Sequence, residues 1–305
     1  MDESPSTNIF RKATLQCIDC PEGTVPIKRV GKEELRASKR FFESIPSRSN
    51  EVSPQASKYP GVYQAVAKLN GGYKGIRSKI SAQKLENVAA NHWSTGQMWV
   101  SDDPDGGYIN SLWAGWIVAP TMFQDKGETR LFAHWGTDIN KQCFNTYCGG
   151  FVATSKKTAL GGILTNVSIY GGDQYVIDTY IFQDKGTGNW WLQVEEENVG
   201  YWPKGLIPAL DDGASTVMWG GLTFGPAGEN ASPMGNGRFP LAADFQKSCY
   251  SAHMRTVDSA YNLVEAPKHQ DFNIDCEAAH HVSHFWGASD LGVAILYGGP
   301  GGACS

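Results

Sequence analysis

Three adjacent glutamates, at 195–197 in the run EEEN, are the first residues whose types could do acid–base chemistry. Alternate residues of a strand share a face, so Glu195 and Glu197 could lie together. Hydrolysis by paired carboxylates needs one acid ionised as the base and the other protonated as the acid. No neighbouring residue places this cluster in a cleft, and a solvated hairpin tip is the interpretation that such a charge run favours.

Three histidines in AAHHVSHFWG, at 280, 281 and 284, are the other cluster with a chemical pattern. No carboxylate or thiolate completes a metal site beside them, which favours a surface strand or loop. The sequence contains no phosphate-binding loop, no zinc-protease motif and no nucleophile elbow. We therefore expect neither a cofactor nor a metal.

The seven cysteines have spacings that could close local loops. Cys143 and Cys148 enclose only FNTY, and Cys276 and Cys304 flank the C-terminal segment, which they could staple. An odd count leaves one free thiol, for which Cys249, Cys17 and Cys20 are the candidates. Two glycosylation sequons, at Asn166 and Asn230, favour an oxidising compartment together with these cysteines.

The elements that must position these residues are mostly strands. The chain has 305 residues, 41% of them hydrophobic, which is enough for a sizeable core. Residues 31–46 have a helical pattern that ends at Pro46, and residues 47–59 form a polar stretch that we interpret as an exposed linker. From residue 60 onward, short apolar and aromatic runs alternate with turn residues. This organisation predicts an all-β, antiparallel β-sandwich, preceded by a short, partly helical N-terminal segment.

The charge pattern excludes two classes of partner. The net charge is −5 and no basic stripe is present, which argues against nucleic acid. No apolar run is long enough to span a membrane. The acidic, polar residues at the N-terminus do not have the pattern of a signal peptide. The sequence does not predict an oligomeric state.

A series of motifs then resembles one family. The order is CPEGTVPIKR at 20–29, AGWIVAP at 114–120, TRLFAHW at 129–135, CFNTYCGGFV at 143–152, YGGDQY at 170–175, GNWWLQ at 188–193, VGYWP at 199–203, PMGNGRFP at 233–240 and YGGPGG at 297–302. In this order they are similar to neprosin-like proteins, the plant glutamic peptidases. The similarity covers roughly residues 16–305.

The resemblance implies a secreted precursor that cleaves beside proline at acidic pH without a metal. Residues 1–46 would be the C-terminal part of an activation peptide, and residues 60–305 the β-sandwich domain of catalytic type. Two glutamates would face each other across a groove, one activating water and the other, protonated, steadying the oxyanion. The resemblance also implies the disulfides Cys143–Cys148 and Cys276–Cys304, and a secreted, vacuolar or cell-wall location.

Both catalytic positions depart from the family pattern. The family's Glu-Ala-Gly-Trp motif reads WAGW here, which places Trp113 where the first glutamate should be. The Gly-Gly-Glu motif reads WGGL, which places Leu222 at the second position. Neither side chain can take a proton from water, although the Trp113 indole can still donate a hydrogen bond.

The sequence therefore predicts a protein of glutamic-peptidase fold with little or no peptidase activity, a pseudoenzyme. An aromatic groove would bind a proline-rich peptide or polymer, because rings stack on proline and sugar faces. The candidates for this groove are Trp113, Trp116, Trp135, Trp219 and Leu222; a core position is the alternative for each tryptophan. The alternative function is an active acid prolyl endopeptidase that uses other carboxylates, among them Glu195–Glu197, Asp178 or Glu128. A structural or storage role is a third possibility.

Overall fold

The computed structural model describes residues 10–16, 20–44, 61–103, 109–138, 141–226, 228–241, 244–285 and 289–304. Side chains are described in these ranges except at residues 40–44. The predicted linker at 47–59 and Cys17 lie outside the described residues. No helix among the described residues is long and apolar enough to cross a membrane.

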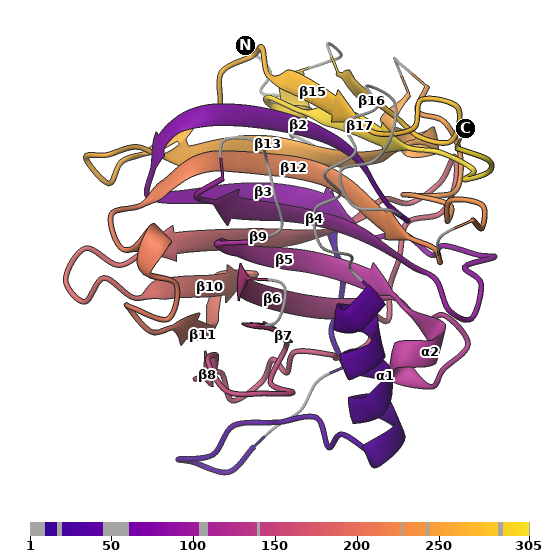
Figure 1. Ribbon diagram of the computed structural model, residues 1–305. Helices are drawn as coiled ribbons and strands as arrows, with labels where there is room; N and C mark the ends of the chain where they lie inside the picture. The colour runs from indigo at the N-terminus through magenta and orange to yellow at the C-terminus, as the bar shows by residue number, and fades with distance from the viewer. Residues whose placement is uncertain are drawn as a thin grey trace, which may run out of the picture.

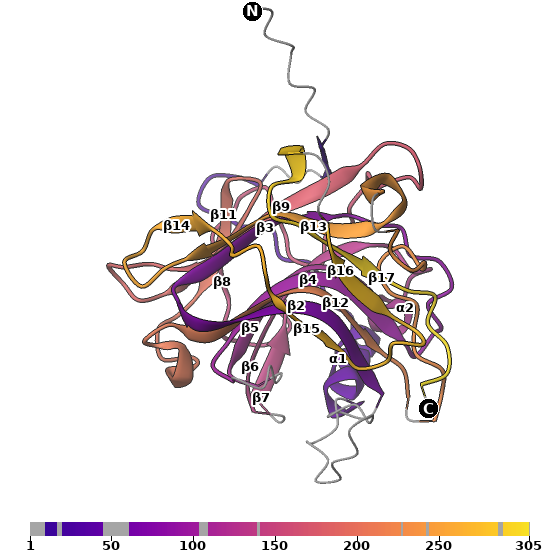
Figure 2. The ribbon, with the colours of Figure 1, turned by 90° about the horizontal axis from the view of Figure 1, so that it is seen from above.

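Two sheets pack face to face, as the sequence predicted for a β-sandwich (Figure 1, Figure 2). The seven-stranded sheet has the order β15 (Asp271–Ile274), β2 (Val62–Tyr73), β12 (Ala214–Phe224), β4 (Trp93–Ser101), β5 (Ser111–Val118), β6 (Arg130–Asp138) and β7 (Lys141–Phe144). The other sheet follows the path β16 (His281–His284), β17 (Ile295–Gly298), β13 (Cys249–Val257), β3 (Gly75–Ser81), β9 (Tyr175–Gln183), β10 (Trp190–Val194), β11 (Glu197–Trp202) and β8 (Val152–Ala153).

Two short strands lie beside that path. Strand β14 (Leu263–Glu265) pairs antiparallel with β13, and β1 (Arg11–Lys12) pairs parallel with β9. The 3₁₀ turns are Pro208–Leu210, Phe245–Lys247 and Ser289–Leu291. Because β1 belongs to the N-terminal segment, that segment contributes directly to the ten-stranded sheet.

Strand alternation explains how the sandwich buries its core. In β9, Ile177, Thr179 and Ile181 are fully buried, whereas Asp178 and Tyr180 between them are only half-buried. This is the period-2 pattern that predicted the strand, and it turns alternate side chains towards the facing sheet. Strand β4 is buried along its whole length because it is central in its sheet and covered on both faces.

Two helices lie on the far side of the seven-stranded sheet from the other sheet (Figure 2). Helix α1 (Lys32–Ser44) falls within the range predicted from its helix-forming residues, and Glu33 and Glu34 in its first turn favour the positive end of the helix dipole. It packs against α2 (Pro120–Phe123). The face of the seven-stranded sheet on this side is called the outer face below, and the face towards the other sheet the inner face.

Both disulfides implied by the family resemblance are present, Cys143–Cys148 and Cys276–Cys304. The first closes a loop at the end of β7. The second ties the chain after β15 to the C-terminal residues. Of the cysteines that the structure describes, Cys20 and Cys249 carry free thiols. Burial raises the pKa of the Cys249 thiol to about 11, so this thiol is inert at ordinary pH.

Candidate functional site

Trp113 and Leu222 both belong to the outer face of the seven-stranded sheet. Trp113 lies on β5 directly opposite Trp99 of β4, and Leu222 lies on β12 opposite Thr95 of the same central strand. Both positions belong to one apolar cluster that also contains Phe132. The fold therefore brings Trp113 and Leu222, the positions predicted to correspond to the family's two glutamates, onto one surface, separated by β4.

A row with almost no side chains runs between these two positions. Gln97 of β4 has Gly115 of β5 on one side and Gly220 of β12 on the other, in direct register. A Cβ at Gly115 would lie 2.2 Å from the carbonyl oxygen of Gly96, and one at Gly220 would lie 2.3 Å from that of Ala65. No larger residue fits at either position, so the Gln97 amide is the only side chain that this row presents. We call Gly115, Gln97 and Gly220 the glycine row.

The Gln97 amide is a buried polar group without a hydrogen-bond partner among the described residues. Its side chain is fully buried, and neither its oxygen nor its nitrogen has a hydrogen-bond partner within the described part of the chain. The same holds for Nε1 of the neighbouring Trp99 and for Oε1 of Gln64, which faces Leu222 from β2. Such groups cost about 1–3 kcal/mol each when they stay unpaired. Together they offer donors and acceptors to a ligand with peptide-like groups.

The described polar neighbours of Trp113 are a hydroxyl and a neutral imidazole. The indole Nε1 of Trp113 donates to Ser111 Oγ at 2.8 Å, which uses the one hydrogen bond that this side chain can give. The ring of His134, opposite on β6, lies 4.0 Å from that of Trp113, and its Nε2 is 3.2 Å from Gln142 Oε1. Burial lowers the pKa of His134 to about 3, against a smaller opposing effect of Gln142. His134 is therefore neutral above that pH and cannot act as a cationic partner.

The prediction that five residues line one groove needs a correction. Trp116, Trp135 and Trp219 lie in the core between the sheets, not with Trp113 and Leu222. The indole of Trp116 donates to Ser81 O of the facing sheet at 2.8 Å. Strand alternation is the reason, because Trp116 and Trp219 are an odd number of residues away from Trp113 and Leu222 on their strands. The aromatic side chains that do share the outer face are Trp93, Trp99, Phe132, Phe144 and Phe224.

The carboxylates proposed as substitutes lie elsewhere. Asp178 forms a two-pronged ion pair with Arg77 on the ten-stranded sheet. Glu195 lies in the β10–β11 turn, where it accepts from the Asp178 backbone N–H, and Glu197 on β11 accepts from Ser155. Glu128 is exposed in the loop before β6. The structure brings none of these four to the glycine row.

A carboxyl group that the sequence did not point to lies beside the outer face. Asp275 follows β15, and its Oδ2 accepts the backbone N–H of Gln64 at 3.1 Å. Burial raises the pKa of Asp275 to about 6, although the hydrogen bonds from Gln64 oppose this shift. Gln64 is the cross-strand neighbour of Leu222. Only the pairing of β15 with β2 places Asp275 here, and no sequence motif marks that pairing.

The other predicted sites are on the surface or in the core. Asn166 and Asn230 are both exposed, as glycosylation acceptors must be; their modification stays a prediction. His280 is buried, with Nε2 2.8 Å from Ser232 O, and burial lowers its pKa to about 4. Its neighbour His281 is exposed, so these two side chains do not converge. In the described ranges, no three His, Cys, Asp or Glu residues gather to hold a metal ion.

Comparison with known proteins gives one family match. A family model described as Neprosin matches residues 90–300, more than half of the chain and the range that contains Trp113, Gln97 and Leu222. Two solved structures of glycoside hydrolase family 16 enzymes from Bacteroides ovatus also align. The mixed-linkage glucan enzyme with bound product has a TM-score of 0.31 and 10% identity over 54% of this chain and 67% of that one. The endo-glucanase has a TM-score of 0.31 and 9% identity, and the alignment covers 58% of this chain and 71% of that one. These two alignments are too weak to bear on function.

Proposed function

We propose that this chain, which belongs to the neprosin family, binds a proline-rich peptide or polymer on the outer face of its seven-stranded sheet and does not hydrolyse it. One observation carries the proposal: Trp113 and Leu222, which the motif resemblance aligns with the two family glutamates, are buried side chains without a titratable group. Trp113 is 1% exposed and Leu222 is fully buried. A glutamic peptidase needs two carboxyl groups, one protonated and one ionised. Trp113 and Leu222 supply no carboxyl group.

Binding is supported by what the outer face keeps. The glycine row lets a ligand backbone approach the sheet closely. The amide of Gln97 and the indole N–H of Trp99 lack partners among the described residues, and an extended peptide could satisfy both. In the full chain this face is covered, since Trp99 and Trp113 are almost completely buried. Met122 and Phe123 of α2, against which α1 packs, belong to the apolar cluster of this face, so we expect ligand access to require movement of these helices.

Retained peptidase activity is the second candidate, and Asp275 is the observation that favours it. A carboxyl group with a pKa of about 6 holds its proton at the acidic pH where a glutamic peptidase works. If Asp275 were the acid, its replacement by Asn would abolish cleavage and leave ligand binding intact. The two disulfides support an oxidising, extracellular or vacuolar location for either function.

The discriminating experiment incubates the full chain with proline-containing peptides from pH 2 to 6 and follows products by mass spectrometry. We expect no cleavage by the wild-type chain and measurable binding of uncleaved peptide. Cleavage next to proline by the wild-type protein would refute the proposal, and its loss in Asp275→Asn would support the second candidate.

Restoring both acids sharpens the result. The double variant Trp113→Glu/Leu222→Glu should gain cleavage at acidic pH, where one of the two carboxyl groups can stay protonated. The matched controls are Trp113→Gln/Leu222→Gln, which has similar volume and no acid, and each single Glu variant. Thermal unfolding of all variants shows whether an inactive one is still folded. A folded double variant without activity would mean that the face has changed beyond its two acids.

A further inference from the structure

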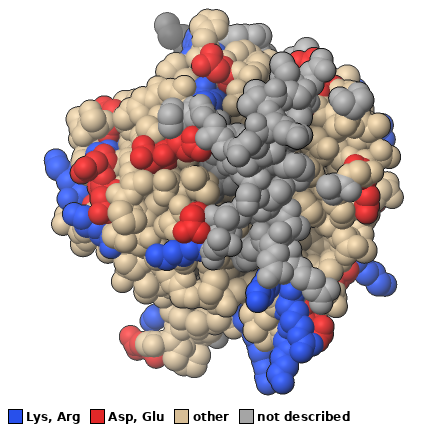
Figure 3. Space-filling view, viewed as in Figure 1, with Lys and Arg blue, Asp and Glu red and all other residues tan. Residues whose placement is uncertain are grey.

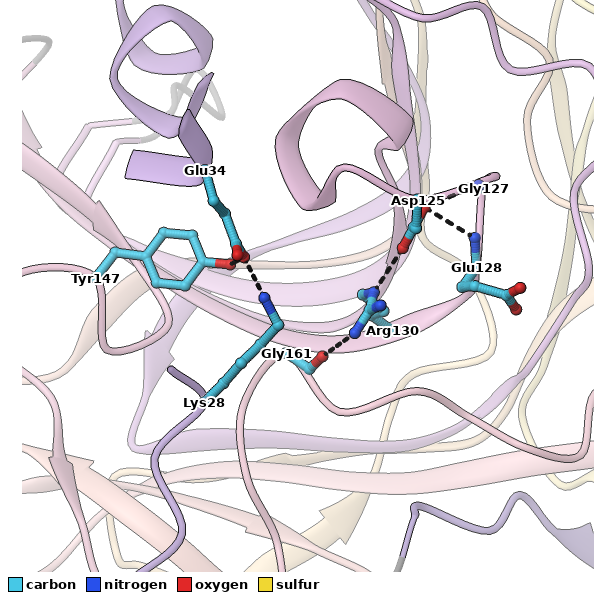
Figure 4. Close-up of polar contacts among 8 residues, drawn as sticks. All are labelled: Lys28, Glu34, Asp125, Gly127, Glu128, Arg130, Tyr147 and Gly161. Carbon is cyan, nitrogen blue, oxygen red and sulfur yellow. Dashed lines mark hydrogen bonds and ion pairs between the residues drawn. The ribbon is translucent and has the colours of Figure 1, made fainter. Parts of the chain in front are cut away.

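A buried carboxylate fastens helix α1 to the rest of the molecule. Glu34 is 7% exposed, and its Oε1 accepts hydrogen bonds from the Tyr147 hydroxyl and from Nζ of Lys28 (Figure 4). Tyr147 lies in the loop closed by Cys143–Cys148 and packs against the apolar cluster of the outer face. One carboxylate thus links α1 to the same face that carries Trp113 and Leu222.

Apart from this contact, α1 buries little apolar surface within its described side chains. Its buried residues are Glu34, Ala37 and Ser38, spaced as one helical stripe, whereas Leu35 is 41% exposed. Ala37 contributes few apolar atoms, so the described side chains of α1 gain little hydrophobic stabilisation from packing. Three basic residues of α1 are exposed, Lys32, Arg36 and Lys39. Figure 3 shows Lys and Arg gathered in the region of this helix. Among the described side chains of α1, the Glu34 carboxylate therefore makes the main polar contact with the rest of the molecule.

The groups that hold this carboxylate also contact residues outside α1. The stem of Lys28 packs against Gly161, where an added Cβ would lie 3.1 Å from its Cδ, and its Nζ lies 5.6 Å from the centre of the Phe123 ring. Phe123 is in turn braced by Arg130, 5.0 Å from the ring centre. Arg130 is itself held by Asp125 at 2.8 Å and by Gly161 O at 2.7 Å (Figure 4). Lys28 and Tyr147 therefore have contacts of their own that do not involve α1.

We propose that Lys28 and Tyr147 form a carboxylate-binding subsite at one end of the outer face, which Glu34 fills as an internal ligand. This rests on the proposed function, and it names the chemistry of the ligand: a peptide with a carboxylate, either from an acidic side chain or from a free C-terminus. That carboxylate replaces Glu34 when α1 moves aside.

The preference for an acid over its amide follows from the two donors. Burial and the nearby Glu34 carboxylate raise the pKa of the Tyr147 hydroxyl far above its usual value, so it keeps its proton and donates. Lys28 can only donate. When Glu34 leaves, two donors remain without an acceptor in a partly buried place. A carboxylate satisfies both with charge-assisted hydrogen bonds, whereas an amide oxygen carries no charge to balance Lys28.

The test measures peptide binding to full-length variants by fluorescence polarisation. The probes are a labelled proline-rich peptide with one glutamate, its glutamine counterpart, and a glutamine version with a free instead of an amidated C-terminus. The variant Glu34→Ala empties the subsite, and Glu33→Ala, at the exposed neighbouring acid, is the matched control. We expect Glu34→Ala to bind the glutamate peptide about tenfold more tightly than the glutamine peptide. Adding Tyr147→Phe should remove most of that preference.

Hydrogen exchange of α1 gives a second readout that needs no ligand. The amides of α1 should exchange at least about tenfold faster in Glu34→Ala than in Glu33→Ala, since one charge-assisted contact is lost. Unchanged exchange would overturn the fastening role of Glu34. Equal binding of all peptides by Glu34→Ala would overturn the carboxylate subsite and leave the proposed function standing. Binding of no peptide by any variant would overturn both. A preference shown only by the free C-terminus would identify the terminal carboxylate as the ligand group.

Discussion

The two faces of the seven-stranded sheet are made by the same strands under different constraints. On the inner face, Trp116 fits over Gly96 and donates its indole N–H to Ser81 of the facing sheet, so both its shape and its polar atom are satisfied. On the outer face, Gln97 is buried with its amide unpaired among the described residues. Trp116 is thus fixed by both shape and hydrogen bonding, whereas Gln97 is held by burial alone among the described residues. The outer face therefore has polar capacity to spare at its centre, which the inner face lacks at Trp116.

The largest expected effect breaks the inner face. Trp116→Ala should lower the free energy of unfolding by about 3–5 kcal/mol, because it opens a cavity between the sheets and leaves Ser81 O without its donor. Urea unfolding measures this change. Trp191→Ala, at a half-buried position on the outside of the ten-stranded sheet, is the control and should cost only about 1 kcal/mol. Equal losses of unfolding free energy in the two variants would contradict the role of Trp116 in stabilising the inner face.

A charge on the outer face should have the next largest effect. Leu222→Glu should cost about 3 kcal/mol at pH 7, since it buries a carboxylate without a partner. Burial raises the folded-state pKa of such a group above its unfolded value, so the cost should shrink as the pH falls and the carboxyl group takes its proton. Urea unfolding at pH 4 and pH 7 tests this, with Leu222→Gln as the control. A cost that does not change between these pH values would indicate that the introduced carboxylate is paired or hydrated.

Asp275 predicts a pH dependence at the edge of the outer face. Its pKa of about 6 exceeds the ordinary value of 3.8, so the folded state binds this proton more tightly. The stabilising effect is therefore complete below about pH 4 and is lost as the pH rises through 6. We compare the free energy of unfolding of Asp275→Asn with that of the wild type. The difference, variant minus wild type, should be about 2 kcal/mol larger at pH 7 than at pH 3.5. If the free energies of unfolding of the two proteins changed in parallel across this pH range, the pKa of Asp275 would be the same in the folded and unfolded states.

The smallest effect separates stability from binding. Gln97→Leu removes an amide that lacks partners and should raise the free energy of unfolding by roughly 1 kcal/mol. The same change should weaken the binding of a proline-rich peptide. Chemical unfolding and fluorescence polarisation measure the two effects, and Gln97→Glu serves as a variant that keeps an acceptor. A lower free energy of unfolding in Gln97→Leu than in the wild type would show that the Gln97 amide is hydrogen-bonded in the folded protein.

Sequence patterns predicted the sandwich, the helix within residues 31–46 and, through the family resemblance, both disulfides. The sandwich and the helix were predictable because strand alternation and helix-forming residues are local signals, as Ile177, Thr179 and Ile181 illustrate. The cysteine pairing came from the family resemblance, since Cys276 and Cys304 lie 28 residues apart. They could not assign Trp116, Trp135 and Trp219 to a face, because proximity to a motif does not reveal the parity of a strand position. Gln97 and Asp275 escaped for a different reason. Their roles arise from register between strands far apart in the sequence, and from the burial that this register produces.

The N-terminal segment is anchored in one layer of the sandwich and reaches across to the other. Phe10 and Ala13 are buried, β1 pairs with β9, and Leu15 bridges to Leu164, so the start of the segment is part of the ten-stranded sheet. Glu34 is therefore a tethered competitor, whose effective concentration at its subsite is on the order of millimolar. Breaking the chain after α1 would not dilute it, because the anchored strand would keep the helix within reach. A free ligand must overcome this local concentration, which sets a threshold below which the face stays closed.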